Sequence, residues 1–138
     1  MANKGFRLVE ELVSHIKGLY PDIRIYLDEV EQGFKEPCFF IHVVDTKYTP
    51  EANKYVKVRS KVDLSYFPPK RKRSECLAMQ EELSYKLLHL PTIHLFDRQY
   101  EVVDNVLHCI FNASTRLKLE EEDIKQRELK VKEEVKDG

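Results

Sequence analysis

The side chains that could do chemistry in this chain are scattered along it. No HExxH pair occurs, and no histidine lies at metal-ligand spacing from a cysteine; the five histidines are His15, His42, His89, His94 and His108. Asp63, Asp97 and Asp104 could form a nuclease-like carboxylate cluster, but each is also explained as a turn residue or as part of the wet face of a strand. No GxGxxG, GxxxxGK or GxSxG motif is present, and four glycines make a phosphate-binding loop improbable. We therefore predict a protein that is not an enzyme and has no metal or cofactor.

The basic tetrad Lys70–Arg73 is the best signal for nucleic-acid binding. Clustered Lys and Arg neutralise phosphates without reading sequence, and the preceding Tyr66 and Phe67 could stack on bases. Against this interpretation, the net charge is −1 and no known nucleic-acid-binding motif is present. A basic loop that faces an acidic segment of a neighbouring protein, Glu29–Glu31 or Glu120–Asp123, is the alternative, since charge complementarity sets register and specificity.

Length and composition indicate one domain in a reducing compartment. The chain has 138 residues, 42% of them hydrophobic and 34% charged, which suits a single core with a large wet surface. Three widely spaced cysteines (Cys38, Cys76, Cys109) lie in apolar runs, as small buried hydrophobes do, and an odd number argues against a disulfide framework. The N-terminus lacks the apolar core of a signal peptide, and no apolar run approaches the roughly 18 residues of a membrane span. We expect folding in a cytoplasm and no membrane association.

The first half of the chain predicts one helix and three strands. Leu8, Leu12 and Ile16 repeat at helical spacing within residues 4–19. Alternation predicts a half-buried strand at 23–27, and the apolar run at 38–44 predicts a strand covered on both faces, with His42 as a hydrogen-bonded core or interface histidine. We expect loops at 29–37 and 46–54.

The strand at 56–66 has the clearest alternation in the chain. Valines, Leu64 and Tyr66 fall on one face, whereas Lys57, Arg59, Lys61 and Asp63 fall on the other. Pro68 and Pro69 end this strand because a proline cannot donate to a sheet ladder. We expect the apolar face of this strand to pack on the core, and the charged face to meet water or a neighbouring subunit.

The second half predicts another helix followed by short strands. Ser74 is the expected N-cap of a helix that ends before Pro91, with Glu75 in its first turn. Its apolar stripe comprises Cys76, Leu77, Met79, Leu83, Leu87 and Leu90. We expect a tight hairpin across Asp97–Arg98, between 93–96 and 100–103, and an antiparallel strand at 106–113 after Asp104–Asn105.

These elements predict an α+β fold with a charged C-terminal extension. We expect a mainly antiparallel sheet of five to six strands, with two helices on one face and the other face free for an interface. Residues 1–117 form the expected domain, and residues 118–138 form the charged extension. The extension suits a solvated helix or frayed end, or else an arm that folds against a neighbouring protomer.

Three segments, in their order and spacing, resemble the tail terminator proteins of long-tailed bacteriophages and phage-derived tail-like particles. They are IRIYLDEVEQGFKEPCFFI at 23–41, NKYVKVRSKVDLSYFP at 53–68 and YEVVDNVLH at 100–108. The similarity covers roughly residues 8–112. It implies a structural α+β subunit of a homohexameric ring, which caps the head-proximal end of the tail tube and stops its polymerisation.

The resemblance also implies partners and a place of assembly. The expected partners are the tube protein, the sheath protein if the tail is contractile, and a head-completion or connector protein, with DNA only passing through the lumen. Assembly would occur in the bacterial cytoplasm, and the protein would become part of the particle. A head–tail connector or neck subunit is the alternative, followed by a nucleic-acid-binding module that uses Lys70–Arg73.

We expect the contacts with other subunits or with the tail to come from charged residues of two loops and one strand. The strand residues could line the lumen or a seam between subunits. These candidate contact residues are Glu29, Glu31, Lys35, Lys57, Arg59, Lys61, Lys70, Arg71, Lys72 and Arg73.

Overall fold

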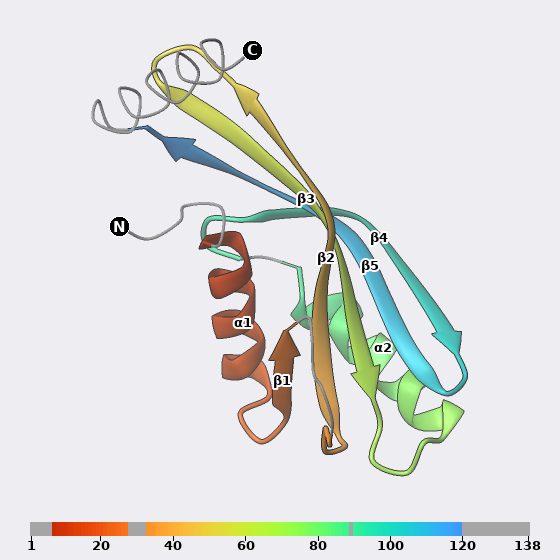
Figure 1. The fold of residues 1–138 in the computed structure, drawn as a ribbon. Coiled ribbons are helices and arrows are strands. Elements are labelled where there is room, and N and C mark those ends of the chain that lie inside the picture. The colour runs from red at the N-terminus through yellow and green to blue at the C-terminus, as the bar shows by residue number, and fades with distance from the viewer. Residues whose placement is uncertain (1–6, 28–32, 89, 120–138) are drawn as a thin grey trace, which may run out of the picture.

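The computed structural model describes residues 7–27, 33–88 and 90–119. Its elements follow in the order α1 (Arg7–Leu19), β1 (Arg24–Leu27), β2 (Cys38–Pro50), β3 (Tyr55–Phe67), α2 (Arg73–Lys86), β4 (His94–Val103) and β5 (Val106–Lys118) (Figure 1). The strands form one sheet in the order β1-β2-β3-β5-β4. Only β1 and β2 pair in parallel, and the other pairs are antiparallel. The predicted α+β class is confirmed, with five strands.

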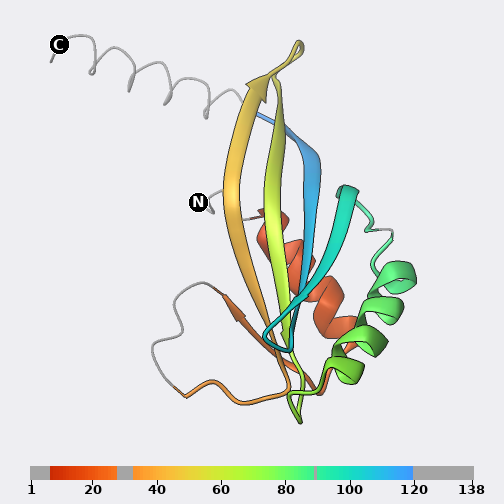
Figure 2. The same cartoon turned by 90° about the vertical axis from the view of Figure 1, so that its right-hand side faces the viewer.

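Both helices pack on the same face of the sheet (Figure 2). The core joins Leu12 of α1 and Leu83 of α2 to Phe39 of β2, Leu64 of β3 and Phe111 of β5, all of them almost completely buried. The predicted periods are confirmed, since α1 buries Leu8, Leu12 and Ile16 and β3 alternates buried valines with exposed cations. No helix of the described residues is long and apolar enough to cross a membrane.

The strands β2, β3 and β5 continue past the helices as an arm (Figure 1). We define the arm as residues 45–50 of β2, 55–61 of β3 and 112–118 of β5, which pair in register. Val56, Val58 and Leu117 form a second, small hydrophobic cluster there, on the face that carries the helices farther down. The predicted loop at 46–54 is therefore wrong for residues 46–50 and confirmed only for residues 51–54. The polar side chains of 45–50 are exposed, so this segment lacks the alternation of a half-buried strand, yet its backbone pairs with β3 as far as Pro50.

The prediction that residues 38–44 are covered on both faces is also wrong. Cys38, Phe39 and Ile41 are buried, but His42 is exposed and half of the Val44 surface is accessible. The helices cover only one face of the sheet, and a bulge between Val43 and Asp45 shifts the register there. This strand is therefore only partly buried, although its sequence is a nearly continuous apolar run.

One of the two predicted turns in the second half is a bulge. The strand β4 runs without interruption through Asp97–Arg98, where its register with β5 shifts between Phe96 and Gln99, so the predicted tight hairpin is wrong. Asp97 has a positive φ of 55°, which aspartate tolerates better than most residues. The turn at Asp104–Asn105 is confirmed, with φ of 51° and 58° and a β4–β5 hairpin around it.

The helix α2 begins one residue before Ser74, and its N-cap is Lys72, so the predicted cap is wrong. The Glu75 carboxylate accepts hydrogen bonds from the backbone N–H groups of Lys70 and Lys72, both at 3.1 Å. Glu75 is the third residue of the helix, and its side chain reaches back to the N–H of the N-cap residue, as in a capping box. Leu77 is 45% exposed and does not belong to the buried stripe.

Most of the charged extension, residues 120–138, lies outside the described residues. The boundary between residues 117 and 118 therefore stays a prediction, although β5 includes Lys118.

Replacing Leu83 with Ala should lower the free energy of unfolding by about 2–5 kcal/mol, because its side chain is fully buried between α2 and the sheet. Replacing Leu77 with Ala in the same helix is the matched control, and should change it by about 0.5 kcal/mol or less. Chemical denaturation of the two variants measures both values. Equal losses would contradict the assignment of the buried face of α2.

Candidate functional site

The sheet face opposite the helices, here called the open face, carries the three candidate contact residues of β3, Lys57, Arg59 and Lys61. Outward positions of neighbouring strands form cross-strand rows, such as His42, Asp63 and Ile110, or Phe40, Ser65 and His108. These rows divide the open face into an aromatic end, a polar centre and the basic side of the arm.

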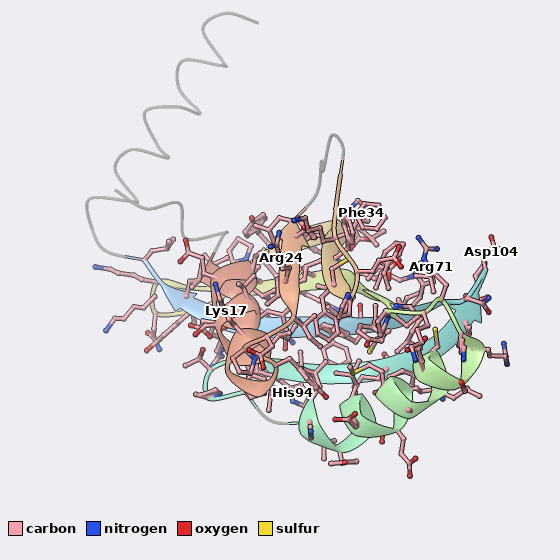
Figure 3. The ribbon with its side chains drawn as sticks, turned by 90° about the horizontal axis from the view of Figure 1, so that it is seen from below. Lys17, Arg24, Phe34, Arg71, His94 and Asp104 are labelled. Atoms are coloured by element: carbon pink, nitrogen blue, oxygen red, sulfur yellow. The ribbon has the colours of Figure 1, made fainter. Side chains whose placement is uncertain are left out.

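The aromatic end is built by Tyr26, Phe34, Phe40 and Phe67. Their ring centroids lie 5.1–5.3 Å apart in four pairs. Phe34 and Arg71 lie on the side of the sheet away from α2 (Figure 3), and the Arg71 guanidinium stands 5.1 Å from the centre of the Phe67 ring. Tilted and edge-on contacts of this kind add to the stabilisation from simple burial. The cluster fixes the segment before β2 against the end of β3.

Arg71 also joins the two loops that were predicted to make contacts. Its guanidinium lies 2.7 Å from the Glu36 carboxylate, and this hydrogen bond lowers the pKa of Glu36 and raises that of Arg71. Because the folded pKa of Glu36 is lowered, the pair contributes above the ordinary carboxylate pKa and is lost as the pH falls through the folded value. One member of the basic tetrad therefore has an acidic partner in its own chain.

The other predicted loop residues divide into two groups. Lys70, Lys72 and Arg73 are exposed around the start of α2, and Lys35 is exposed while its N–H donates to the Tyr26 hydroxyl. Glu29 and Glu31 lie outside the described residues. The structure thus leaves three cations of the tetrad facing solvent beside the aromatic end.

The polar centre contains a serine, a histidine and an aspartate in contact. Nδ1 of His108 lies 3.0 Å from the Ser65 hydroxyl and 3.2 Å from both Asp63 carboxylate oxygens, and the hydroxyl donates to Asp63 at 3.1 Å. A catalytic triad needs opposite ring nitrogens for the serine and the aspartate. Here one nitrogen serves both, so the arrangement suits a structural network rather than nucleophile activation.

The remaining candidates for chemistry are dispersed. Asp97 is in the β4 bulge and Asp104 is in the β4–β5 turn, away from Asp63. Among the described residues, no group of three or more His, Cys, Asp or Glu side chains could hold a metal ion. All three cysteines are buried free thiols, and burial raises the pKa of Cys38 to about 11 and that of Cys109 to about 12. Such thiols are poor nucleophiles near neutral pH.

The basic side of the arm contains the predicted cations of β3. Lys57, Arg59 and Lys61 are exposed and alternate with buried residues, as the sequence predicted. The Arg59 guanidinium stands 4.8 Å from the centre of the Phe96 ring, on which His94 is stacked. Arg116 of β5 lies beside them and pairs with Glu51 at 2.8 Å. Sequence reasoning missed Arg116 because it assumed that the last strand ends at residue 113.

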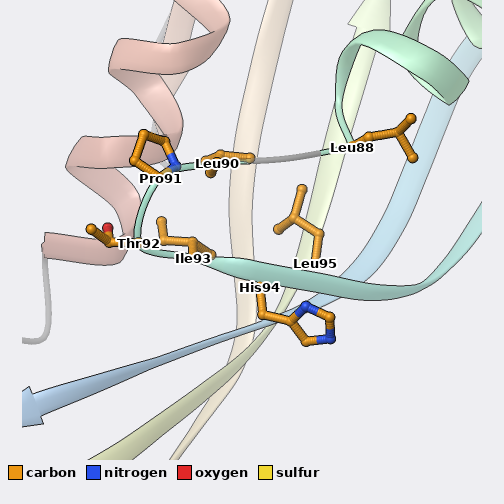
Figure 4. A pocket seen from close by; sticks show the side chains of 7 residues that line it. All are labelled: Leu88, Leu90, Pro91, Thr92, Ile93, His94 and Leu95. Atoms are coloured by element: carbon orange, nitrogen blue, oxygen red, sulfur yellow. The ribbon is translucent and has the colours of Figure 1, made fainter.

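Two cavities adjoin the start of β4. One, of about 300 Å³, lies between the end of α2 and β4 (Figure 4) and is lined by Leu88, Leu90, Pro91, Thr92, Ile93, His94 and Leu95. Its lining holds one titratable side chain, so it has no group of residues suited to catalysis. The other, of about 530 Å³, opens on the basic side of the arm between Lys57 and Arg116.

Comparison with known protein families shows to which family this chain belongs. The family model described as phage tail terminator protein matches residues 7–126. The chain belongs to the phage tail terminator family. No curated protein matches it. The match includes every helix and strand of the described residues and continues beyond the residues on which the resemblance rested. Its role is that of a phage tail terminator, and a structural family of this kind favours a role without catalysis.

The Arg71–Glu36 pair should hold the segment before β2 in place. Arg71→Glu would set two carboxylates against each other, and we expect faster amide hydrogen exchange at residues 33–37, measured by mass spectrometry. The double variant Glu36→Arg/Arg71→Glu should restore protection. Lys70→Glu, in the same loop, is the matched control and should leave exchange at 33–37 unchanged. Unchanged exchange in Arg71→Glu would show that the pair does not hold this segment.

Proposed function

We propose that this tail terminator works as a homohexameric ring that caps the head-proximal end of the tail tube. The ring ends polymerisation of the tube, and of the sheath in a contractile tail, and then offers the surface to which the head or a head-completion protein binds. The family match over residues 7–126 carries this proposal. Assembly takes place in the bacterial cytoplasm, and DNA only passes through the lumen.

Two features of the fold support the proposed ring. A closed ring requires that one patch of each subunit match a different patch of the next. The sheet offers unlike surfaces, because helices cover one face while the other exposes the aromatic end and the basic arm. Among the described residues, β1 pairs with β2 only along Cys38–Ile41, so residues 42–50 have a strand partner on one side. Strand edges of this kind are templates for pairing with another chain.

Termination requires two different ring faces. One face must resemble the next layer of the tube, and the other must reject a further layer through its charge or shape. We assign the contacts with the tail to the loop cations Lys70, Lys72 and Arg73, which stand at the end of the sheet opposite the arm. The arm then belongs to the contacts between subunits.

A head–tail connector or neck subunit is the second candidate, and an exposed basic loop also suits a nucleic-acid-binding module. Gene order separates the first alternative, because a terminator gene tends to lie just before the sheath or tube genes. Measurable affinity for duplex DNA that falls steeply with salt would favour the second.

Loss of the protein should leave tails that continue to grow. We expect tails of abnormal and heterogeneous length, without heads, in lysates of a deletion mutant examined by electron microscopy. Expression of the chain from a plasmid should restore uniform tails. Tails of normal length in the deletion mutant would contradict the capping role.

Reversing the three solvent-facing loop cations tests the tail contact. The variant Lys70→Glu/Lys72→Glu/Arg73→Glu retains Arg71, so the pair with Glu36 and the circular dichroism of the monomer should be unchanged. We expect at least about a tenfold drop in completed tails, because like or unpaired charges at an interface are costly. The single variant Arg71→Glu is the comparison: it breaks the pair with Glu36 but keeps the three solvent-facing cations, so it measures the effect of a disturbed loop without a loss of these cations. Uniform, head-joined tails with the triple variant would exclude these residues as contacts.

A further inference from the structure

The open side of the arm is a basic surface. Its outward positions carry basic residues from three strands, and the acidic residues beside them are Asp45 and Glu51. The basic residues are Lys47 of β2, Lys57, Arg59 and Lys61 of β3, and Arg116 and Lys118 of β5. The whole chain has a net charge of −1, so this concentration of positive charge is local. A surface of this kind selects an acidic ligand.

The shape of the surface suits carboxylates. The cavity of about 530 Å³ is lined by Lys57, Arg116, Ser114 and His94, and by Glu51, whose carboxylate is paired with Arg116. Among the described residues, Arg116 is the one cation of this set in an ion pair, and its Nε donates to the Glu51 carboxylate at 2.8 Å. A guanidinium has five N–H donors in a fork that matches a carboxylate, so Arg116 retains donors for a ligand. The face is both charged and hollowed.

The chain itself contains an acidic segment that starts at this arm. The Leu119 N–H donates to the Lys54 carbonyl at 2.7 Å, which places the end of the described chain at the tip of the arm. Glu120, Glu121, Glu122 and Asp123 follow directly. To cover its own arm with them, the chain would have to reverse without any residue for a turn. Four extended residues span at most roughly 14 Å, so Glu120–Asp123 can reach only the arm of an adjacent subunit that lies beside this tip.

We propose that Glu120–Asp123 of one subunit binds the basic side of the arm of the next subunit, around Lys57, Arg59 and Arg116. This inference rests on the proposed ring and names one of its subunit contacts. Because each subunit has one acidic segment and one basic arm, the contact joins unlike patches, which is the kind of interface that a closed ring requires. The occupant is thus a second copy of this chain.

The first test measures binding of a fluorescent peptide with the sequence of residues 118–128. The protein is the full chain in which Glu120→Lys/Glu121→Lys/Glu122→Lys/Asp123→Lys removes its own competing segment. We expect the peptide to bind, and to bind at least about tenfold more weakly when Lys57→Glu/Arg59→Glu/Arg116→Glu is added. A peptide with the four acidic residues changed to lysine is the control. Absence of binding, or binding that ignores the arm substitutions, overturns the proposal.

The second test asks whether the contact is made between chains. A chain with the reversed arm and a chain with the reversed segment should each associate poorly in sedimentation velocity. Their mixture should form heterodimers, because it alone pairs an intact arm with an intact segment. A chain with both reversals should again self-associate. Peptide binding without heterodimers would assign the contact to a single chain and overturn the proposal.

Duplex DNA is the competing ligand for the same cations. If duplex DNA binds the arm and the peptide does not displace it, the surface is a nucleic-acid site and the proposal fails. Tail length is scored separately in the deletion mutant complemented with each variant. Uniform tails from the arm-reversed chain would reject this contact and leave the capping role intact, whereas normal tails without any protein would reject the capping role.

Discussion

The structure depends on one constraint, the one-sided burial of β3 in the middle of the sheet. Val62, Leu64 and Tyr66 point into the core under the helices, so the residues between them must face away from it. A shift of one residue would bury Lys61 and Asp63 and expose the core, which fixes the register with β2 and β5. The same alternation continues into the arm. One periodic strand thereby defines both the hydrophobic core and the charged open face.

The two ends of the open face differ in the interactions that hold them in place. At the aromatic end, the rings of Phe34, Phe40 and Phe67 and the Arg71–Glu36 pair fix two loops together within one chain. Their positions are set before any partner binds, which reduces the entropy lost on binding. In the arm, long strands carry cations far from the main core and are stabilised by the small cluster of Val56, Val58 and Leu117. The first end suits a contact with defined shape, and the second suits a contact governed by charge.

The chemistry-bearing side chains fit a structural role for physical reasons. The thiols are buried, so their thiolate forms are disfavoured. Ser65 and Asp63 share one nitrogen of His108, whereas a catalytic triad places the serine and the aspartate on opposite ring nitrogens. These residues satisfy one another's hydrogen bonds in the middle of a half-covered sheet, where unpaired polar groups would be costly. Membership of the tail terminator family agrees with this interpretation.

The sequence by itself determined the parts that follow from local periodicity. Neighbouring residues alone determine the stripe of Leu8, Leu12 and Ile16, the alternation of β3 and the turn at Asp104–Asn105. The sequence segments at 23–41, 53–68 and 100–108 were enough to indicate the family. Tertiary structure decided the rest. Strand pairing extended β2 through a polar segment to Pro50, and pairing with β5 converted the turn expected at Asp97 into a bulge. The partner of Arg71 is Glu36, 35 residues away. Such contacts depend on which strands lie side by side, and local periodicity carries no information about pairing between distant segments.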